Sequence, residues 1–324
     1  KKTPENQNSY IKIIFDQIML SIIIVNYNST NHTIECLESL ERQNFDDFEI
    51  LLIENFSDDY YRKFLYDYLD SGKLKEEFLQ KINLIETNEN LGFTGGNNLG
   101  IRNAQGEVIL LLNNDTLHQP NFLKEMVDFF NKYSIIDIAQ PRICFYPNIN
   151  IIWCDGGSIN KFSHKLFSHF NYLEKIENID KKNLKIDYAV GCALFIRRRI
   201  LRDIGLLDDI YFMYCEESDL CYRAKLKGYR NIYSHPSAVI YHKIPKKFSK
   251  AYKKYYYKNR IIFVIKHFNF LLIFWQIIMQ IVSMLFITAD MDNKRIDYSF
   301  LLKSIKNTLK GLKYGFLVRF KKNS

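Results

Sequence analysis

Asp115 is the first residue whose type and position point to chemistry. It follows the apolar run Val108–Leu112 and the asparagines Asn113 and Asn114, so it lies where a buried strand is expected to end. A carboxylate at such a place can bind a divalent cation, which in turn bridges the two phosphates of a nucleotide. Asn and Asp are also common in the turns that follow strands. On its own, Asp115 therefore fits a turn as well as it fits a metal site.

A second candidate is the acidic cluster of Glu216, Glu217 and Asp219, which follows a run of aromatic residues. Crowded carboxylates in a partly apolar cleft have raised pKa values, and one of them can then take a proton from a hydroxyl group. Acids also occur at the solvated start of a helix, where they complement the helix dipole. His242 ends an apolar run and is a metal-ligand candidate only if it lies beside Asp115, because imidazole and carboxylate together suit Mn2+.

A glycine-rich segment begins at Gly92 and continues to Asn97 and Asn98. It has neither the GxGxxG spacing of dinucleotide-binding loops nor the GK[ST] ending of a P-loop. Its glycines allow a backbone to approach a ligand closely, and a helix that begins here would present its N-terminus to an anion. We expect a turn over Gly92–Gly96 and a helix over 97–104.

The elements that must position these residues are short, apolar, β-branched runs, which are typical of buried parallel strands. Strands that alternate with helices, such as one over about 58–70, imply right-handed crossovers and a doubly wound, mostly parallel α/β sheet. Ligands bind outside the carboxyl ends of the strands in such sheets, and polar residues collect there in this sequence. The expected strands are Leu20–Val25, Phe48–Ile53, Ile82–Ile85, Val108–Leu112, Tyr188–Ile196 and Val239–Tyr241.

The composition narrows the class of protein. Hydrophobic residues make up 47% of the 324 residues and charged residues 25%, so the chain can form a sizeable core and is not expected to be disordered. The formal net charge of +9 favours an anionic partner, and nucleic acid, a membrane surface and a sugar nucleotide all qualify. The six cysteines form no CxxC pair, so we expect reduced thiols that face the cytosol, and neither a disulfide framework nor a zinc site.

Seven segments, taken in order, resemble the glycosyltransferase family 2 enzymes of bacterial polysaccharide assembly, particularly the rhamnosyltransferase-like group. The resemblance extends over about residues 20–265. It implies a GT-A fold and an inverting transfer from a nucleotide-diphosphate sugar. The segments are IIIVNYNS (22–29), IENFSDD (53–59), NENLGFTGGNNLGI (88–101), LLLNNDT (110–116), GCALFIRR (191–198), GLLDDIYFMYCEESDLCYRAKLKGY (205–229) and VIYHK (239–243).

The resemblance also implies roles for residues. The DxD-like motif falls on Asn113, Asn114 and Asp115, which would hold the metal and the diphosphate, and His242 can complete the metal site. The metal of such enzymes is a divalent cation, Mn2+ or Mg2+. The acidic motif supplies the general base, which falls on Glu217, with Glu216 and Asp219 beside it. The residues expected to hold the nucleotide are Asn26, Tyr27, Asn28, Glu54, Asn55, Asn90, Gly92, Asn97 and Asn114.

Three positions depart from the family pattern. Asn113 replaces the first acid of the DxD motif, so the metal depends on Asp115. Glu54 and Glu217 each replace an aspartate, and a base shifted by about 1 Å can cost on the order of 100-fold in rate. These departures leave open a membrane-bound scaffold without catalysis on the same fold. The QxxRW motif of processive synthases is absent, so one or a few sugars are expected to be added to each acceptor.

The C-terminal third of the chain is basic. Between Lys243 and Lys266 there are nine Lys or Arg and no acid, and Phe268–Ala289 is a run of 22 residues without a charge. That run is long enough to span a bilayer. Its polar residues fall on one helical face, which favours a helix in the membrane interface, or one packed on the catalytic domain, over a spanning helix. They are Asn269, Gln276, Gln280 and Ser283.

The last segment places lysines on one helical face and apolar residues on another. A basic amphipathic helix is typical of a surface held by anionic lipid, although a solvated lysine face over an ordinary core gives the same pattern. The basic residues belong to no nucleic-acid recognition motif, so nucleic acid is not an expected partner. The lysines are Lys303, Lys306, Lys310 and Lys313, and the apolar residues are Leu302, Ile305, Leu309, Leu312 and Phe316.

These observations divide the chain into three parts: residues 1–19, a leader of unclear role without a visible cleavable signal peptide; 20–245, a GT-A catalytic domain; and 246–324, a basic amphipathic helical region. The expected activity is transfer of rhamnose or another hexose in cell-surface polysaccharide synthesis. The expected partners are a dTDP- or UDP-linked sugar donor, a glycan or lipid-linked acceptor and an anionic membrane surface. The expected location is the cytoplasmic face of the membrane, with peripheral or monotopic attachment.

Overall fold

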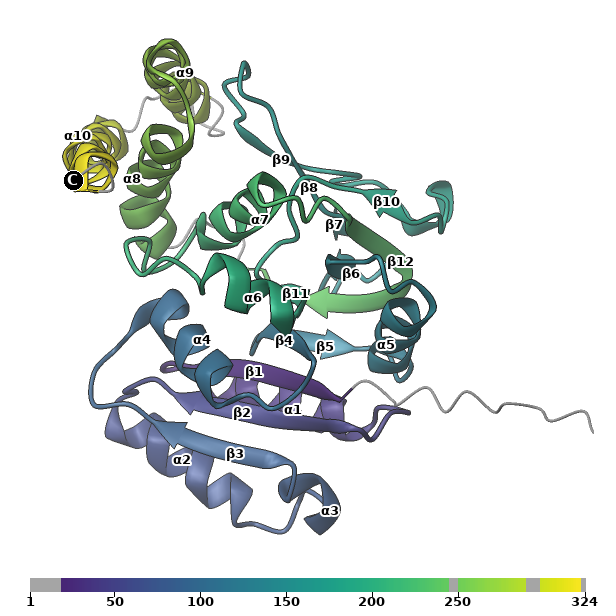
Figure 1. The fold of residues 1–324 in the computed structure, drawn as a ribbon. Coiled ribbons are helices and arrows are strands. Elements are labelled where there is room, and N and C mark those ends of the chain that lie inside the picture. The colour runs from purple at the N-terminus through teal and green to yellow at the C-terminus, as the bar shows by residue number, and fades with distance from the viewer. Residues whose placement is uncertain (1–18, 245–249, 290–297, 322–324) are drawn as a thin grey trace, which may run out of the picture.

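The computed structural model of the chain describes residues 19–244, 250–289 and 298–321 (Figure 1). Residues 1–18 of the expected leader (1–19) lie outside the described residues. A ten-stranded sheet forms the centre of the molecule, in the order β10–β12–β6–β11–β4–β1–β2–β3, with β5 paired to β12 and β7 to β6. Helices cover this sheet, and three C-terminal helices pack at one end of the molecule (Figure 1).

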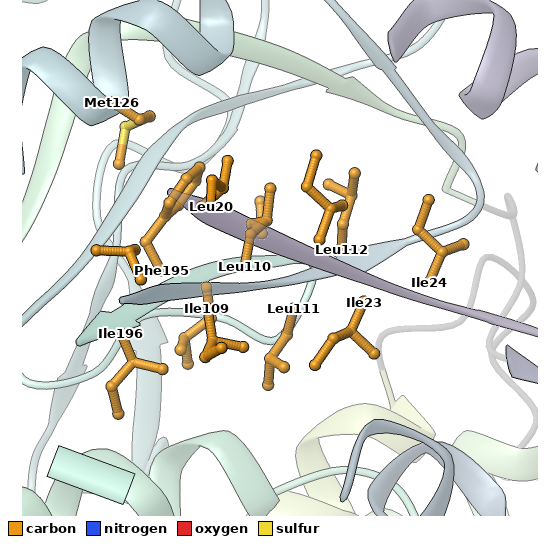
Figure 2. Packing of buried hydrophobic residues seen from close by; sticks show 14 of the residues in the cluster. Leu20, Ile23, Ile24, Ile109, Leu110, Leu111, Leu112, Met126, Phe195 and Ile196 are labelled. Atoms are coloured by element: carbon orange, nitrogen blue, oxygen red, sulfur yellow. The ribbon is translucent and has the colours of Figure 1, made fainter. Parts of the chain in front are cut away.

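The N-terminal half of the sheet is parallel, as the sequence predicts. β1 pairs with β2 and β4, and β2 pairs with β3, all in parallel register. Successive side chains of β1 and β4 point to opposite faces of the sheet and are buried on both (Figure 2). This double burial explains the continuous apolar runs. The strands are β1 (Leu20–Asn26), β2 (Phe48–Glu54), β3 (Ile82–Glu86) and β4 (Val108–Asn113).

The glycine-rich segment is the first part of a helix, α4 (Gly92–Asn103), which corrects the expected turn over Gly92–Gly96. A Cβ atom added at Gly96 would lie 3.0 Å from the side chain of Val25, and one at Gly100 would lie 2.4 Å from that of Ile23. These two glycines therefore let α4 pack closely on β1. The other helices that cover the sheet are α1 (Thr30–Glu41), α2 (Asp59–Leu69), α3 (Glu76–Leu79), α5 (Phe122–Lys132), α6 (Arg198–Ile204) and α7 (Glu216–Leu226).

The other half of the sheet is mixed, so the expectation of a mostly parallel sheet is wrong there. β11 lies between β4 and β6 and runs antiparallel to both, whereas β12 is parallel to β6 and antiparallel to β5 and β10. β11 begins at Ala193, later than predicted; Tyr188 forms an isolated bridge with Gly157, and the amide of Val190 donates to the side chain of Gln140. The strands are β5 (Thr116–His118), β6 (Ile138–Phe145), β7 (Ile152–Cys154), β10 (Leu184–Lys185), β11 (Ala193–Arg197) and β12 (Ile232–His242), and β8 (Gly157–Ile159) pairs with β9 (Phe167–His169) in a separate hairpin.

The C-terminal region forms α8 (Lys250–His267), α9 (Phe270–Ala289) and α10 (Tyr298–Lys321). α8 lies between α7 and the other two helices (Figure 1). Residues 261–265 of α8 are fully buried, in a second apolar core that includes Tyr211 and Cys215. In the three described ranges, no helix combines the length and apolar character needed to cross a membrane.

Candidate active site

Asp115 and His242 are brought together by the sheet. β5 begins at Thr116, immediately after Asp115, and its antiparallel register pairs Thr116 with His242 at the end of β12. The amide of Lys243 also donates to the backbone oxygen of Asp115, at 3.0 Å. The Nε2 atom of His242 consequently lies 3.1 Å from Oδ1 of Asp115. The condition under which His242 becomes a metal-ligand candidate is met.

The pair fits a divalent cation. The buried Oδ1 atom of Asp115 has no aligned hydrogen-bond donor, although His242 is close. Two adjacent ligands of an octahedral ion, each about 2.1 Å from the metal, lie about 3 Å apart, which is the spacing seen here. The described part of the chain holds no group of three or more His, Cys, Asp or Glu residues that could bind a metal. The remaining coordination positions would fall to water and substrate phosphates, as is usual for Mg2+.

The neighbours of this pair set its charge. Burial disfavours the ionised carboxylate, but the imidazole of His242 holds the pKa of Asp115 below its usual range. Burial likewise disfavours a charged imidazole, yet Cys192 and Asp115 raise the pKa of His242 well above its usual value. The ring of Trp153 packs against the imidazole in a T-shaped contact with centroids 4.8 Å apart. The imidazole of His242 therefore lies beside a thiol, a carboxylate and an aromatic ring.

Glu217 lies in the first turn of α7 and is half-buried. Burial raises the pKa of Glu217 to about 7. Glu216 is fully buried beside it, and burial together with the Glu217 charge raises the pKa of Glu216 well above its usual value. A carboxylate with a pKa near neutrality can accept a proton from a hydroxyl group. Of these two acids, Glu217 is the one with solvent access.

Asp219 plays a different part from these two acids. Its carboxylate accepts hydrogen bonds from Lys266 at 2.6 Å, His267 at 2.7 Å, Arg223 at 2.7 Å and Tyr211 at 3.1 Å, and it is fully buried. Burial opposes its ionisation, but these donors hold the pKa of Asp219 far below its usual range. The carboxylate thus ties α7 to α8. The hydrogen bonds favour a positioning role over proton transfer, in contrast to the expectation that placed Asp219 with the candidate bases.

The loop before α7 has an unusual backbone. Phe212, Tyr214 and Cys215 all have positive φ angles, of 62°, 69° and 73°. Asn259 of α8 donates from its side-chain amide to the backbone oxygens of Tyr211, Met213 and Tyr214, at 2.7, 2.7 and 2.9 Å. Backbone strain of this kind persists only where surrounding contacts hold it. Asn259, which the sequence analysis did not single out, supplies those contacts.

Gly191 and Cys192 lie between the Asp115–His242 pair and Glu217. A Cβ atom added at Gly191 would lie 3.8 Å from the Cβ atom of Glu217 and 3.1 Å from the ring of Phe93. The next residue, Cys192, lies close enough to His242 for each side chain to shift the pKa of the other. Its backbone oxygen accepts from the amide of Asn113, two residues before Asp115, at 2.9 Å. The Gly191–Cys192 segment therefore borders both parts of the site.

The expected nucleotide residues lie at the carboxyl ends of β1 and β2 and bond to one another. Asn26 donates to Glu54 at 2.5 Å and accepts from Thr33 at 2.7 Å. The second oxygen of Glu54 accepts from the amide of Ser57 at 2.7 Å. Glu54 is fully buried, and both of its carboxylate oxygens accept hydrogen bonds within this network. The ring of Tyr27, by contrast, is 45% exposed.

The remaining members of that set also have partners within the protein. Asn55 donates to Asn90 at 3.2 Å and accepts from the amide of Leu91 at 3.0 Å. A Cβ atom added at Gly92, which has a φ of +70°, would lie 2.6 Å from the backbone oxygen of Phe212. The absence of a side chain at Gly92 therefore leaves space for the loop before α7. The side-chain amide of Asn97 donates to the backbone oxygen of Phe93 at 2.8 Å, and that of Asn114 donates to the hydroxyl of Thr33 at 2.8 Å. The side-chain oxygen of Asn28 accepts from the amide of Asp58 at 2.7 Å.

The sequence model of the family described as "Glycosyl transferase family 2" matches residues 21–205, which is more than half of the chain. The chain belongs to glycosyltransferase family 2. The matched residues include the strand-end asparagines and Asp115, and they end before Glu217.

Two proteins with assigned names are similar to part of the chain. The low-salt glycan biosynthesis hexosyltransferase Agl10 of Haloferax volcanii is 28% identical over 215 residues, which are 64% of this chain and 61% of Agl10. The poly(ribitol-phosphate) β-N-acetylglucosaminyltransferase TarS of Staphylococcus aureus is 24% identical over 59% of this chain and 29% of its own length. The matched region thus spans less than two thirds of the length of each of these relatives.

Solved structures show the same fold. GalNAc-T7 with UDP, GalNAc and Mn2+ aligns with a TM-score of 0.61 at 15% identity, over 92% of this chain and 56% of that protein. The mannosyltransferase PcManGT of Pyrobaculum calidifontis, in complex with GDP-Man and Mn2+, aligns with a TM-score of 0.57 at 13% identity, over 91% of this chain and 87% of its own. This family 2 chain therefore has a GT-A-like α/β fold with a mixed sheet.

Proposed function

We propose that this family 2 chain moves rhamnose or another hexose, with inversion, from a dTDP- or UDP-linked donor to a hydroxyl group of a glycan or lipid-linked acceptor. The observation that carries the proposal is the contact of Asp115 with His242, which Gly191 and Cys192 connect to Glu217. The names of Agl10 and TarS support glycosyl transfer in the assembly of a cell-surface polymer. The UDP, GDP-Man and Mn2+ bound in the structural relatives support a nucleotide-diphosphate sugar and a divalent cation.

The donor would lie across the carboxyl ends of β1, β2 and β4. Asp115 and His242, with Asn113 beside them, would hold Mn2+ or Mg2+, which when bound would neutralise charge on the diphosphate leaving group. The exposed ring of Tyr27 is free to stack on the nucleobase. The other strand-end side chains, among them Asn26, would shape the donor site through their own hydrogen bonds and their backbone.

Glu217 acts as the general base in this proposal. The acceptor hydroxyl oxygen attacks the anomeric carbon of the donor sugar and forms the new glycosidic bond. The bond between that carbon and the diphosphate oxygen breaks, and the nucleotide diphosphate leaves with the electron pair. Glu217 takes the hydroxyl proton, which its raised pKa permits near neutral pH. Glu216 and Asp219 hold Glu217 in place, one as a buried neighbour and the other through α8.

Calorimetric titration tests the proposal and separates it from a non-catalytic scaffold. The chain should bind UDP or dTDP more tightly with Mn2+ than without it, and the Asp115→Ala variant should lose this enhancement and all sugar transfer. Asp128→Ala, which removes an exposed surface carboxylate, is the matched control and should behave as the unchanged chain. A folded chain that shows no metal-dependent nucleotide binding would instead favour the scaffold, and full transfer by Asp115→Ala would exclude the metal assignment.

A further inference from the structure

Helix α9 has its polar side chains on the inside. Gln276 is fully buried and donates to the backbone oxygens of Lys161 and Ser163, at 2.6 and 3.2 Å. Gln280 is also fully buried and donates to Thr308 of α10 at 2.7 Å. Gln276 and Gln280 of the predicted polar stripe therefore face the protein, whereas Asn269 precedes the helix and is exposed. The side chain of the stripe's last member, residue 283, lies outside the described residues.

The opposite half of α9 exposes large apolar side chains. Leu271 is 84% exposed and Phe274 is 68% exposed. At 100° per residue the exposed side chains fall within one half of the helix, away from Gln276 and Gln280. A contiguous exposed apolar surface of this kind marks a contact with another apolar phase or molecule. The exposed residues are Phe270, Leu271, Phe274, Trp275, Ile278 and Ile281.

Helix α10 has the same arrangement. Ser304, Thr308, Gly311 and Gly315 are buried, and a Cβ atom added at Gly311 would lie 2.5 Å from a backbone oxygen of α8. The small residues thus let α10 pack closely on α8. Three residues of the expected apolar face, Leu302, Ile305 and Leu309, are exposed and do not pack in the core. Exposed lysines lie on the same outer half of the helix. The lysines on this outer half are Lys303, Lys306, Lys310 and Lys313.

The charges indicate which partner covers these two outer faces. Residues 250–289 and 298–321 include no Asp or Glu, so the exposed lysines of α10 have no acid on these helices to pair with. A symmetric contact with a second copy would place the same surface, lysines included, against itself. An anionic lipid surface offers both an apolar interior and negative headgroups, and each lysine near such a surface adds to the attraction.

We propose that the outer face of α9 and α10 inserts into the surface of an anionic phospholipid membrane, with the α9 side chains among the acyl chains and the α10 lysines among the headgroups. This attachment is independent of the proposed sugar transfer, because it involves none of the residues assigned to the donor or the base. α8 lies between these helices and the loop before α7, so the membrane would lie on the side of α8 that faces away from the sheet (Figure 1).

Vesicle flotation with the full chain tests the proposal. The chain should float with vesicles that contain phosphatidylglycerol, should float less with phosphatidylcholine alone, and should be released progressively as salt is added. The Leu271→Gln/Phe274→Gln variant should bind at least about tenfold more weakly, since both side chains would otherwise be buried in the membrane. Its matched control is Tyr60→Gln/Ile135→Gln, which changes an aromatic and an aliphatic residue that are 75% and 64% exposed on the sheet domain, and it should bind as the unchanged chain.

Further measurements separate the competing outcomes. Quenching of Trp275 fluorescence by brominated lipid acyl chains, lost in Trp275→Phe, would place α9 in the membrane. Binding by Leu271→Gln/Phe274→Gln that equals that of the unchanged chain would overturn the proposal. A dimer in solution that the same variant converts to a monomer, without vesicle binding by either protein, would assign this face to self-association instead. Asp115→Ala should float normally whether or not sugar transfer is confirmed, so failure of one proposal leaves the other testable.

Discussion

The two sides of the candidate site are held in different ways. On the donor side, Asn26, Glu54 and Asp115 lie at the carboxyl ends of adjacent parallel strands. Their hydrogen bonds and close contacts lie within the first 120 residues, apart from those of Asp115 with His242 and Lys243. On the base side, Glu217 follows a loop whose backbone is held by Asn259 from α8. The strand-end residues of the donor side lie within the residues that match the family, whereas His242 and Glu217 lie beyond them. The donor side is therefore held mainly by residues close to its own strands, whereas the base side depends on contacts from α8.

The largest effect should come from the base itself. Glu217→Gln keeps the size of the side chain but removes the proton acceptor, so kcat should fall by about 100- to 10,000-fold, the range for a lost general base. Binding of the metal and nucleotide diphosphate should stay the same, because the donor side does not use this carboxylate. Rapid-quench or coupled nucleotide-release assays measure kcat, and calorimetry measures the binding of the metal and the nucleotide diphosphate.

Glu77→Gln on α3, a surface position, is the control for the loss of one carboxylate and should leave kcat unchanged. Parallel losses of catalysis and of nucleotide binding in Glu217→Gln would show that the two sides of the site are not separate. Activity close to that of the unchanged chain would remove Glu217 as the base.

A smaller effect is expected from the residue that holds the loop before α7. Asn259→Leu keeps a similar volume but removes three hydrogen bonds to a backbone with positive φ angles. A displacement of about 1 Å at the base would lower kcat by about 10- to 100-fold, with little change in the KM for the donor. The variant should also lose about 1–3 kcal/mol of unfolding free energy, because backbone oxygens are left without donors.

Asn103→Leu, at the exposed end of α4, is the matched control for loss of an amide and should change neither quantity. Denaturant unfolding measures the stability difference. If folded Asn259→Leu retains the kcat of the unchanged chain at low temperature, Asn259 stabilises the fold without positioning the base.

The pH dependence should distinguish the base side from the donor side. Because burial raises the pKa of Glu217 to about 7, kcat should fall about tenfold for each pH unit below that value, and Glu217→Gln should lack this fall. The same shift affects stability. A carboxyl group whose pKa is higher in the folded state favours folding below its unfolded pKa, and this contribution is lost as pH rises through about 7.

Glu217→Gln should therefore melt at a higher temperature than the unchanged chain at about pH 8 and at the same temperature at about pH 4. Calorimetric melting at both pH values checks this. An equal melting temperature at the higher pH would mean that the folded protein does not disfavour the charged carboxylate.

The sequence was most informative where function depends on neighbours along a strand. Asp115 and the polar residues after β1 and β2 could be located because an apolar run predicts a strand and the strand's end predicts the crevice. The mixed half of the sheet could not be predicted in this way, since the direction of β11 depends on its pairing with β4 and β6. Asn259 gave no signal either, because an asparagine within a basic segment shows its role only when the distant loop 211–214 is placed against it.

The periodicity of the C-terminal helices indicated which residues share a helical face but not whether that face packs on the protein or is exposed. Gln276 and Gln280 share one face, as predicted, but the same spacing fits a stripe that faces water or one that faces the protein. The hydrogen bonds of Gln276 to the 161–163 segment decide between them, and those partners lie more than 100 residues away. Glu54 illustrates the same limit, because the sequence did not indicate that its carboxylate accepts a hydrogen bond from the amide of Ser57.

The smallest effect should come from the donor side, at the exposed ring of Tyr27. Stacking of an aromatic side chain on a base contributes about 1–3 kcal/mol, and partial solvent exposure places this contact at the low end, so Tyr27→Ala should raise the KM for the donor about three- to tenfold. kcat and the melting temperature should stay the same, because the ring is 45% exposed and the base is held from α8. Tyr27→Phe should restore the KM if stacking is the cause. A fall in kcat in Tyr27→Ala would instead show that the donor side helps to position the sugar for attack, and the two sides of the site would then be coupled through the substrate.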